Sequence, residues 1–308
     1  MKKDFVVTRK KSTFAGFIIE YRGMSLFEDI VIYEHLADAF IVCLLSAITC
    51  GIVGSYVVAR RMVFLSGGIT HASFGGLGLA IYAGFNPLVG ALLFASVASV
   101  GVEFASRRGR IREDSAIGII WSVGMALGAL FMSLTPGYAV ELPSYLFGSI
   151  SLVDGSDIKW LAALMAVVVV GALVWGRKIM YITFDEEYAK SQGLPVAAIA
   201  YAMSVVVAIT IVLSIKVMGI VLLMSLVTIP TVVANTLTKD YRLITLLAVV
   251  VALVSNIVGF IMSYEITLPN GGGVPTGSCI IFLLSMSLLL VKLFDMVRRR
   301  VARSTIRA

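Results

Sequence analysis

The sequence contains nine runs of about 20 predominantly apolar residues, separated by short polar segments. The runs cover roughly 36–58, 62–84, 87–105, 115–134, 158–175, 195–215, 217–237, 243–263 and 277–294. An α-helix needs a run of this length to cross the hydrocarbon core of a bilayer. The sequence therefore predicts an all-α polytopic integral membrane protein with eight to nine transmembrane helices. Eight stays open because Pro230 would kink or shorten the run in which it lies.

The composition excludes other classes of protein. Of the 308 residues 59% are hydrophobic and 14% are charged, whereas a soluble domain has about 45–50% apolar and about 25% charged residues. A soluble enzyme, an extracellular binding domain and a disordered regulator are excluded, because none of them could keep so much apolar surface from water. The three cysteines, Cys43, Cys50 and Cys279, have no metal-binding or redox spacing and are interpreted as buried thiols.

The distribution of positive charge predicts the orientation. If the basic segment 107–112 is cytoplasmic and the runs alternate, 17 Lys and Arg residues lie inside, against Lys159 and Lys216 outside. The C-terminus is then cytoplasmic. The N-terminal segment disagrees, because nine crossings place its six basic residues outside.

The predicted spans form one transmembrane domain, and three segments lie outside or between them. Residues 1–35 are interpreted as an N-terminal amphipathic or interfacial segment. A segment that lies on the membrane surface would reduce the disagreement between its basic residues and the outside location that nine crossings give it. Residues 36–295 form the transmembrane domain, and residues 296–308 form a basic cytoplasmic tail. The stretch 140–153 is only half apolar and is interpreted as an interfacial or re-entrant helix.

Two ionisable residues interrupt the apolar runs. His71 lies in a thirteen-residue stretch with five glycines and three small hydroxyl residues, 66–78, which predicts close packing against other helices. A histidine there either binds a transition metal or has a structural role as a packed polar side chain. Glu103 ends the third run at helical spacing from Arg107, which predicts a surface ion pair.

One polar segment has the composition of a short helix. Residues 181–194 contain three consecutive acidic residues near the start, Asp185, Glu186 and Glu187, and Gly193 near the end. Acidic residues favour a helix N-terminus and glycine favours a helix stop. The segment is therefore either a solvated loop helix or a docking site for a partner.

Four blocks of sequence, in this order and spacing, resemble a known family. They are Arg60-Arg61-Met62 with Thr70-His71-Ala72, Ala116-Ile117-Gly118-Ile119 through Tyr145-Leu146-Phe147-Gly148-Ser149, Phe184-Asp185-Glu186-Glu187-Tyr188-Ala189 through Gly193, and Gly219-Ile220-Val221-Leu222-Leu223 with Pro230. The sequence resembles the permease subunits of ATP-binding-cassette importers for zinc, manganese or iron over about residues 36–294.

The resemblance implies partners for this chain. A second permease subunit, identical or paralogous, would complete the pathway, a cytoplasmic ATP-binding subunit would dock on 181–194, and an extracytoplasmic protein would deliver metal. The chain itself would be non-catalytic and bind no cofactor, because ATP is used by the partner. Its setting would be the lipid of a bacterial inner membrane, with no role in binding nucleic acid.

The same resemblance implies roles for individual residues. It places Asp185, Glu186, Glu187, Ala189 and Gly193 in the coupling helix. It places His71, with Thr70 and Ser73, in the substrate pathway, with His71 as the metal ligand.

One position departs from the family pattern and keeps alternatives open. The family often has an aspartate three residues before the histidine, where this chain has Gly68. Without that carboxylate the substrate is either a free divalent metal or a chelated one. An ion-gradient-driven transporter is a further alternative, although such proteins usually need carboxylates within the membrane. A membrane-embedded enzyme is the weakest class, because no catalytic constellation is visible.

Overall fold

The computed structural model describes residues 10–14, 17–21, 33–109, 111–135, 155–267 and 274–307. These residues form nine long helices and one short one. The helices are α2 (Glu34–Ala59), α3 (Val63–Ala83), α4 (Pro87–Arg107), α5 (Glu113–Ser133), α7 (Gly155–Phe184), α8 (Glu186–Ser191), α9 (Val196–Met218), α10 (Ile220–Leu237), α11 (Tyr241–Glu265) and α12 (Thr276–Arg307). All nine long helices are long and apolar enough to cross a membrane. The prediction of an all-α polytopic membrane protein is confirmed, with nine spans among the described residues.

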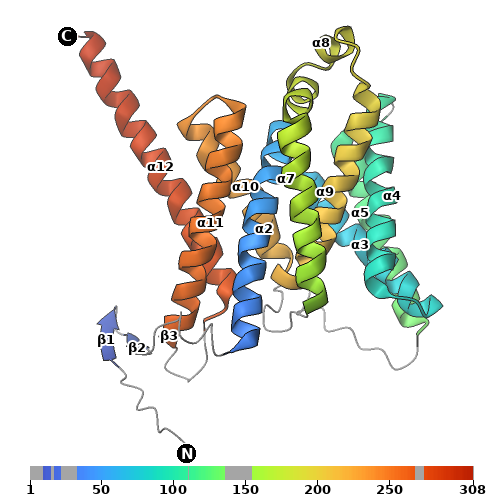
Figure 1. Ribbon diagram of the computed structural model, residues 1–308, viewed down its shortest axis with the longest axis horizontal. Helices are drawn as coiled ribbons and strands as arrows, with labels where there is room; N and C mark the ends of the chain where they lie inside the picture. The colour runs from blue at the N-terminus through green and yellow to red at the C-terminus, as the bar shows by residue number, and fades with distance from the viewer. Residues whose placement is uncertain are drawn as a thin grey trace, which may run out of the picture.

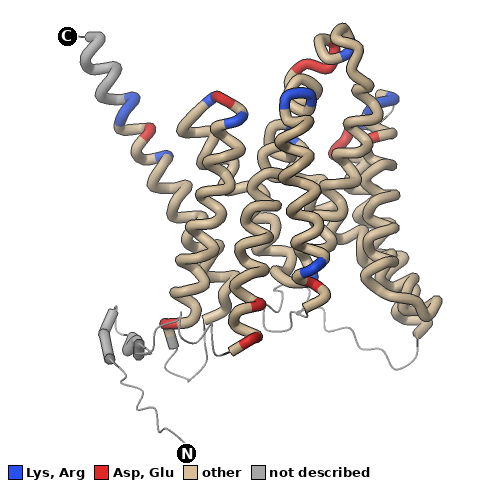
Figure 2. Tube along the Cα trace, in the orientation of Figure 1, with Lys and Arg blue, Asp and Glu red and all other residues tan. Residues whose placement is uncertain are grey.

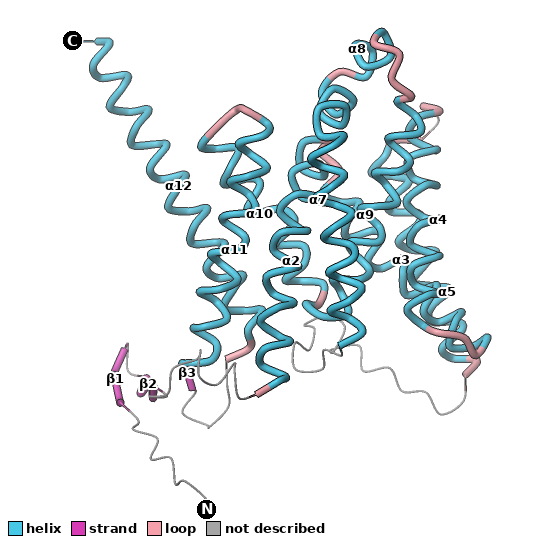
Figure 3. The backbone as a smooth tube through the Cα atoms, in the orientation of Figure 1, coloured by secondary structure: helices cyan, strands magenta, loops and turns pink. Residues whose placement is uncertain are grey.

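The long helices run side by side as one bundle (Figure 1). Helix α2 lies between α7 on one side and α10 and α11 on the other, while α3 packs against α4 and α5. Figure 3 shows that most of the connections between helices are short. The interpretation of 140–153 as a re-entrant helix falls outside the described residues.

Glycines allow α3 to approach its neighbours, as its composition predicted. A Cβ at Gly124 of α5 would lie 2.5 Å from the Cα of Ala72, and one at Gly128 would lie 2.7 Å from the carbonyl oxygen of Phe74. Gly76 of α3 faces Gly90 of α4 in the same way. Small residues therefore bring the backbones into contact, which is a common way for helices to associate in a membrane.

A single glycine reverses the chain between α9 and α10. Gly219 has φ 76° and ψ 166°, a conformation that is essentially restricted to glycine. Pro230 lies inside α10 and is buried. At 18 residues, α10 is the shortest of the nine long helices of the described chain.

Three short strands were not anticipated from the sequence. Strands β1 (Lys10–Phe14) and β2 (Phe17–Tyr21) pair antiparallel, with Lys10 opposite Tyr21, and β2 pairs antiparallel with β3 (Ile266–Thr267). β-Branched and aromatic residues in these segments favour extended structure. Because β3 directly follows α11, the strands lie at the end of the bundle opposite α8 (Figure 1).

The two ends of the bundle differ in charge. Lysines and arginines gather at the end that carries α8, as Figure 2 shows, and we call this the basic end. Lys216 lies at the opposite end, where its Nζ is 2.6 Å from Asp157 Oδ1 at the start of α7. Helix α12 continues to Arg307, so the described part of the predicted basic tail is an extension of the last helix.

Candidate functional site

His71 lies on α3 and faces α5. Its ring stacks on that of Trp121, with centroids 4.3 Å apart and an interplanar angle of 4°. The Nδ1 atom is buried and has no hydrogen-bond partner among the described residues. In the neutral tautomer with its proton on Nε2, Nδ1 has a lone pair that can bind a metal ion.

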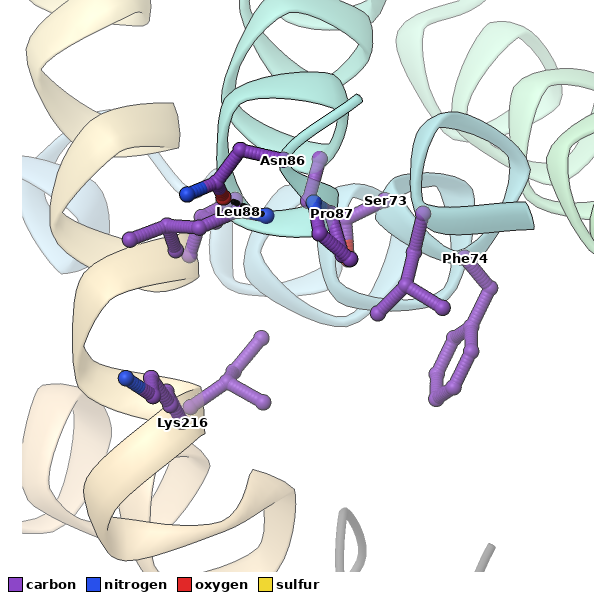
Figure 4. Close-up of a pocket in the computed structure, with 10 residues that line it drawn as sticks. Ser73, Phe74, Asn86, Pro87, Leu88 and Lys216 are labelled. Carbon is purple, nitrogen blue, oxygen red and sulfur yellow. Dashed lines mark hydrogen bonds between the residues drawn. The ribbon is translucent and has the colours of Figure 1, made fainter. Parts of the chain in front are cut away.

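The other two predicted pathway residues lie differently. Thr70 is buried, and its hydroxyl donates to the carbonyl oxygen of Ser66 at 2.7 Å. The Ser73 hydroxyl donates to the carbonyl oxygen of Thr70 at 2.6 Å. Ser73 also lines a cavity of about 230 Å³ between α3, α4 and α9 at the end opposite α8, shown in Figure 4. The three residues thus do not converge, since His71 contacts α5 and Ser73 faces this cavity.

The cavity is mainly apolar with a charged edge. Phe74, Asn86, Pro87 and Leu88 contribute to its wall, and Lys216 stands at its border on α9 (Figure 4). The Asn86 side chain accepts a hydrogen bond from the backbone N–H of Leu88 and so caps α4. The cavity therefore has a rigid turn on one side and the end of α9 on the other.

The space beside Gly68 is occupied by a side chain of the neighbouring helix α5. A Cβ at this position would collide with Cγ2 of Ile117 on α5. An aspartate here would require Ile117 to move. Within the described residues there is no group of three or more His, Cys, Asp and Glu side chains that could hold a metal. The site therefore offers a metal one imidazole and no adjacent carboxylate at position 68.

The predicted coupling segment forms a short helix at the basic end. Residues 181–184 belong to α7, and α8 itself runs over Glu186–Ser191. The Asp185 side chain accepts a hydrogen bond from the backbone N–H of Tyr188 at 2.9 Å and caps α8. Ala189 is fully buried and packs with Ile182 and Val196.

A residue with a left-handed backbone conformation follows α8. Gly193 follows α8 with φ 72°, and its N–H donates to the carbonyl oxygen of Lys190. An L-residue with a side chain is disfavoured in this conformation. The acidic start and glycine stop predicted from the sequence are therefore the capping residues of α8.

Glu186 joins α8 to the transmembrane helices. Its Oε1 lies 2.8 Å from Arg60 Nη1 after α2 and 3.1 Å from Arg107 Nη2 at the end of α4. Burial alone would raise the pKa of Glu186, but the hydrogen bond from Arg60 and the charge of Arg107 lower it below the ordinary range. Glu186 is therefore ionised at neutral pH.

Glu103 completes this arrangement from inside the bundle. Its Oε1 lies 2.7 Å from Arg107 Nε and 3.5 Å from Arg60 Nη2, and the Ser204 hydroxyl of α9 donates to its Oε2 at 3.4 Å. The predicted pair with Arg107 is confirmed, but its assignment to the surface is wrong. Glu103 is 2% exposed, because α9 covers it. We call Arg60, Glu103, Arg107 and Glu186 the ion cluster; its two positive and two negative charges balance.

Arg60 was not predicted as a functional residue. The sequence did contain a signal for its role, which is opposite charge at one end of the bundle. Arg60 and Arg107 each follow or end an apolar run at the predicted cytoplasmic end, where the acidic segment 185–187 also lies. For Arg60, burial alone would lower the pKa, but the hydrogen bond to Glu186 and the nearby negative charge raise it. Which acid pairs with which arginine depended on the helix arrangement.

Aromatic side chains lie on α8 and on the residues just before it. The ring of Tyr188 contacts that of Tyr181 edge-on at 5.4 Å, and the ring of Phe184 contacts that of Tyr241 edge-on at 5.7 Å. Phe184 is 64% exposed and Tyr188 is 46% exposed. Exposed aromatic residues beside a charged rim are typical of surfaces that bind another protein.

Comparison with known proteins gives consistent matches. A model of the ABC 3 transport family matches residues 32–291. A probable metal transport system membrane protein of Thermotoga maritima is 33% identical over 252 residues, 82% of this chain and 89% of the relative. The manganese transport system membrane protein MntC of Listeria monocytogenes is 28% identical over 85% of this chain and 93% of its own.

The fold also matches a solved structure. It is similar to a chain of PsaBC from Streptococcus pneumoniae in complex with Fab, with a TM-score of 0.74 and 22% sequence identity. The match covers 86% of this chain and 94% of that chain. The likeness therefore extends over almost the whole bundle.

Proposed function

Because this chain belongs to the ABC 3 transport family, we propose that it is the permease subunit of an importer that moves a divalent transition metal into the cytoplasm. A separate ATP-binding subunit would hydrolyse ATP. The names of the relatives support a metal substrate, and the manganese relative makes Mn²⁺ the first ion to test among zinc, manganese and iron. Membership of this family favours ATP over an ion gradient as the energy source.

The observation that carries the proposal is the attachment of α8. Helix α8 projects from the basic end of the bundle (Figure 1) and is tied by Glu186 to Arg60 and Arg107. A partner that moves α8 would therefore displace the ends of α2 and α4. Such rigid-body motion of packed helices is a standard route to alternating access.

The α2–α3 turn would carry this displacement toward His71. Arg60 is followed by Arg61, whose φ of 61° makes the tight turn, and then by α3. His71 lies two helical turns into α3. A single imidazole ligand suits brief binding during passage, because release must follow capture.

The charge distribution supports the orientation of the partners. The positive-inside rule makes the basic end cytoplasmic, so the C-terminus and α8 face the ATP-binding subunit. The opposite end, with the cavity beside Lys216, would receive metal from an extracytoplasmic binding protein. A second permease subunit, identical or paralogous, would complete the pathway in the bacterial inner membrane.

The coupling role is tested by uptake in proteoliposomes that contain this chain and its ATP-binding subunit. Glu186→Gln should lower the Mn²⁺ imported per ATP hydrolysed, because α8 loses its charged bonds to two helices. Asp114→Asn is the matched control, since Asp114 is exposed in the first turn of α5 and also loses one negative charge. Equal uptake by Glu186→Gln and the wild type would refute the coupling role.

The pathway role is tested at His71 with two variants. His71→Phe keeps an aromatic ring against Trp121 but has no metal-binding nitrogen, whereas His71→Ala removes both. If the nitrogen binds metal, both variants lose uptake while the complex still assembles. If His71→Phe transports like the wild type, His71 acts only through its stacking on Trp121.

The chelated alternative is separated from the free ion by the form of the supplied metal. A free-ion importer takes up Mn²⁺ in buffer and stops when an impermeant chelator is added. A chelate importer does the reverse and requires the metal complex. Omission of ATP in the presence of an ion gradient tests the gradient-driven alternative in the same vesicles.

A further inference from the structure

Helix α12 leaves the bundle at the basic end. Its buried described side chains are Cys279, Ile280 and Leu284, all in its first half. From Leu284 to Arg299 the helix extends for about 22 Å, and Figure 1 shows it inclined away from α10 and α11. Large apolar side chains such as Leu289, Leu293 and Phe294 remain exposed there. No described side chain of α12 after Leu284 is buried, so this part of the helix lies at the surface of the bundle.

A basic groove of about 460 Å³ lies between α10 and α12. Helix α10 and the turn after it contribute Asn235, Thr236 and Lys239, and α12 contributes Lys292, Asp295 and Arg299. The other lining residues lie three, four and seven positions after Val232 on one side and after Lys292 on the other, so each set shares one face. The groove is thus built from the two facing sides of the helices.

The polar groups of the groove have an excess of positive charge. Arg299 Nε lies 2.9 Å from Asp295 Oδ2, so the single carboxylate of the lining is already paired. Lys239 Nζ donates to the carbonyl oxygen of Asn235 at 2.9 Å, which holds its ammonium group at the groove. Lys292 is an exposed third cation. The groove therefore favours an anion.

The membrane limits what can occupy the groove. Leu289 lies three residues before Lys292, so it shares that face of α12, and it is exposed. Within a bilayer an exposed apolar side chain contacts acyl chains. Basic pockets between helices at the cytoplasmic surface attract anionic headgroups. A basic groove next to an exposed apolar helix face therefore matches one amphiphile with a negative head.

We propose that the groove between α10 and α12 binds an anionic phospholipid. Its phosphate would lie among Lys239, Lys292 and Arg299, and an acyl chain would lie along the exposed apolar face of α12 next to the groove. The lipid would bridge α12 to the bundle at the end where the two helices diverge. This inference is independent of the transported substrate and of the role of α8.

The proposal is tested by native mass spectrometry of the full chain, purified in detergent and titrated with lipid. Phosphatidylglycerol should bind at one site more tightly than phosphatidylethanolamine with the same acyl chains. The double variant Lys292→Gln/Arg299→Gln should weaken phosphatidylglycerol binding about 25-fold, from about fivefold for each cation removed. Arg177→Gln/Lys178→Gln is the matched control, because it removes two exposed cations on α7, outside the groove. This control should bind the lipid like the wild type.

Several results would overturn the proposal. Equal loss of phosphatidylglycerol binding in both double variants would indicate general attraction to the basic end. Equal affinity for the two lipids would remove the role of the anionic head. Displacement of the lipid by inorganic phosphate alone would assign the groove to a free anion. A dimer whose formation excludes lipid, and which Lys292→Gln/Arg299→Gln breaks, would assign it to a second copy of the chain.

Discussion

Replacement of Glu103 by alanine should destabilise the protein by about 3 kcal/mol. The substitution removes a carboxylate that is 2% exposed and lies 2.7 Å from Arg107 and 3.5 Å from Arg60. Removal of one partner from a buried ion pair costs about 3–5 kcal/mol, because the other charge is left uncompensated. The lower end of this range applies here because both arginines still form ion pairs with Glu186 after the substitution and are partly exposed.

A double-mutant cycle measures how strongly Glu103 and Arg107 stabilise each other. The free energies of unfolding of Glu103→Ala, Arg107→Ala and the double variant are measured by SDS titration in mixed micelles, followed by circular dichroism. We expect a coupling energy of about 2 kcal/mol, within the range for residues in one charged network. The double variant should therefore be more stable than the sum of the single effects indicates.

The chain contains a matched control for this cycle. Asp295 and Arg299 have the same spacing of four residues on a helix and a similar distance of 2.9 Å, but Arg299 is 70% exposed. A solvated pair of this kind contributes about 0.3–0.5 kcal/mol. A coupling energy for Glu103 and Arg107 no larger than that of the exposed pair would refute the argument that burial gives the ion cluster its strength.

Three further predictions concern the helix crossing, the charge of α8 and its final turn. Gly124→Ala should lower the unfolding free energy by about 1–3 kcal/mol, since its Cβ would meet the backbone of Ala72. Gly118→Ala on the same helix has open space around it and should raise the unfolding free energy by about 0.5–1 kcal/mol. The pKa of Glu186 is lowered in the folded state, so its stabilising effect is present above the unfolded pKa of about 4.3 and is lost as the pH falls through the folded pKa. The difference in unfolding free energy between the wild type and Glu186→Gln should therefore shrink in acid. A difference that stays constant with pH would contradict this. Gly193→Ala should strain the left-handed turn by about 1–2 kcal/mol and speed proteolysis after α8, which unchanged cleavage rates would disprove.

The membrane architecture could be predicted almost completely from the sequence. Each of the nine apolar runs corresponds to one long helix of the described chain, and most boundaries agree within a few residues. This succeeds because a bilayer imposes one strong rule, that a spanning segment must be long, apolar and internally hydrogen-bonded. The strands β1 and β2 were missed although they pair with each other locally, and only the pairing of β2 with β3, some 250 residues away in the chain, depends on the tertiary structure.

The caps of α8 could also be predicted from neighbouring residues in the sequence, but the ion pairs of α8 with other helices could not. Asp185 and Gly193 act within a few residues of themselves, so sequence order is sufficient to predict them. The pairing of Glu186 with Arg60 spans 126 positions. Such a contact follows from the arrangement of whole helices.

The sequence by itself determined the positions of eight to nine spans, their basic end and the short acidic helix, because each depends on local composition. Only the tertiary structure decided that Glu103 is buried, that Ile117 occupies the space beside Gly68, and that α12 diverges from α10 above a basic groove. The physical reason is that within a membrane most helix faces are apolar, so hydropathy cannot distinguish the face that meets lipid from the face that meets protein. That choice is made by side-chain shape and by the few charges that must find partners.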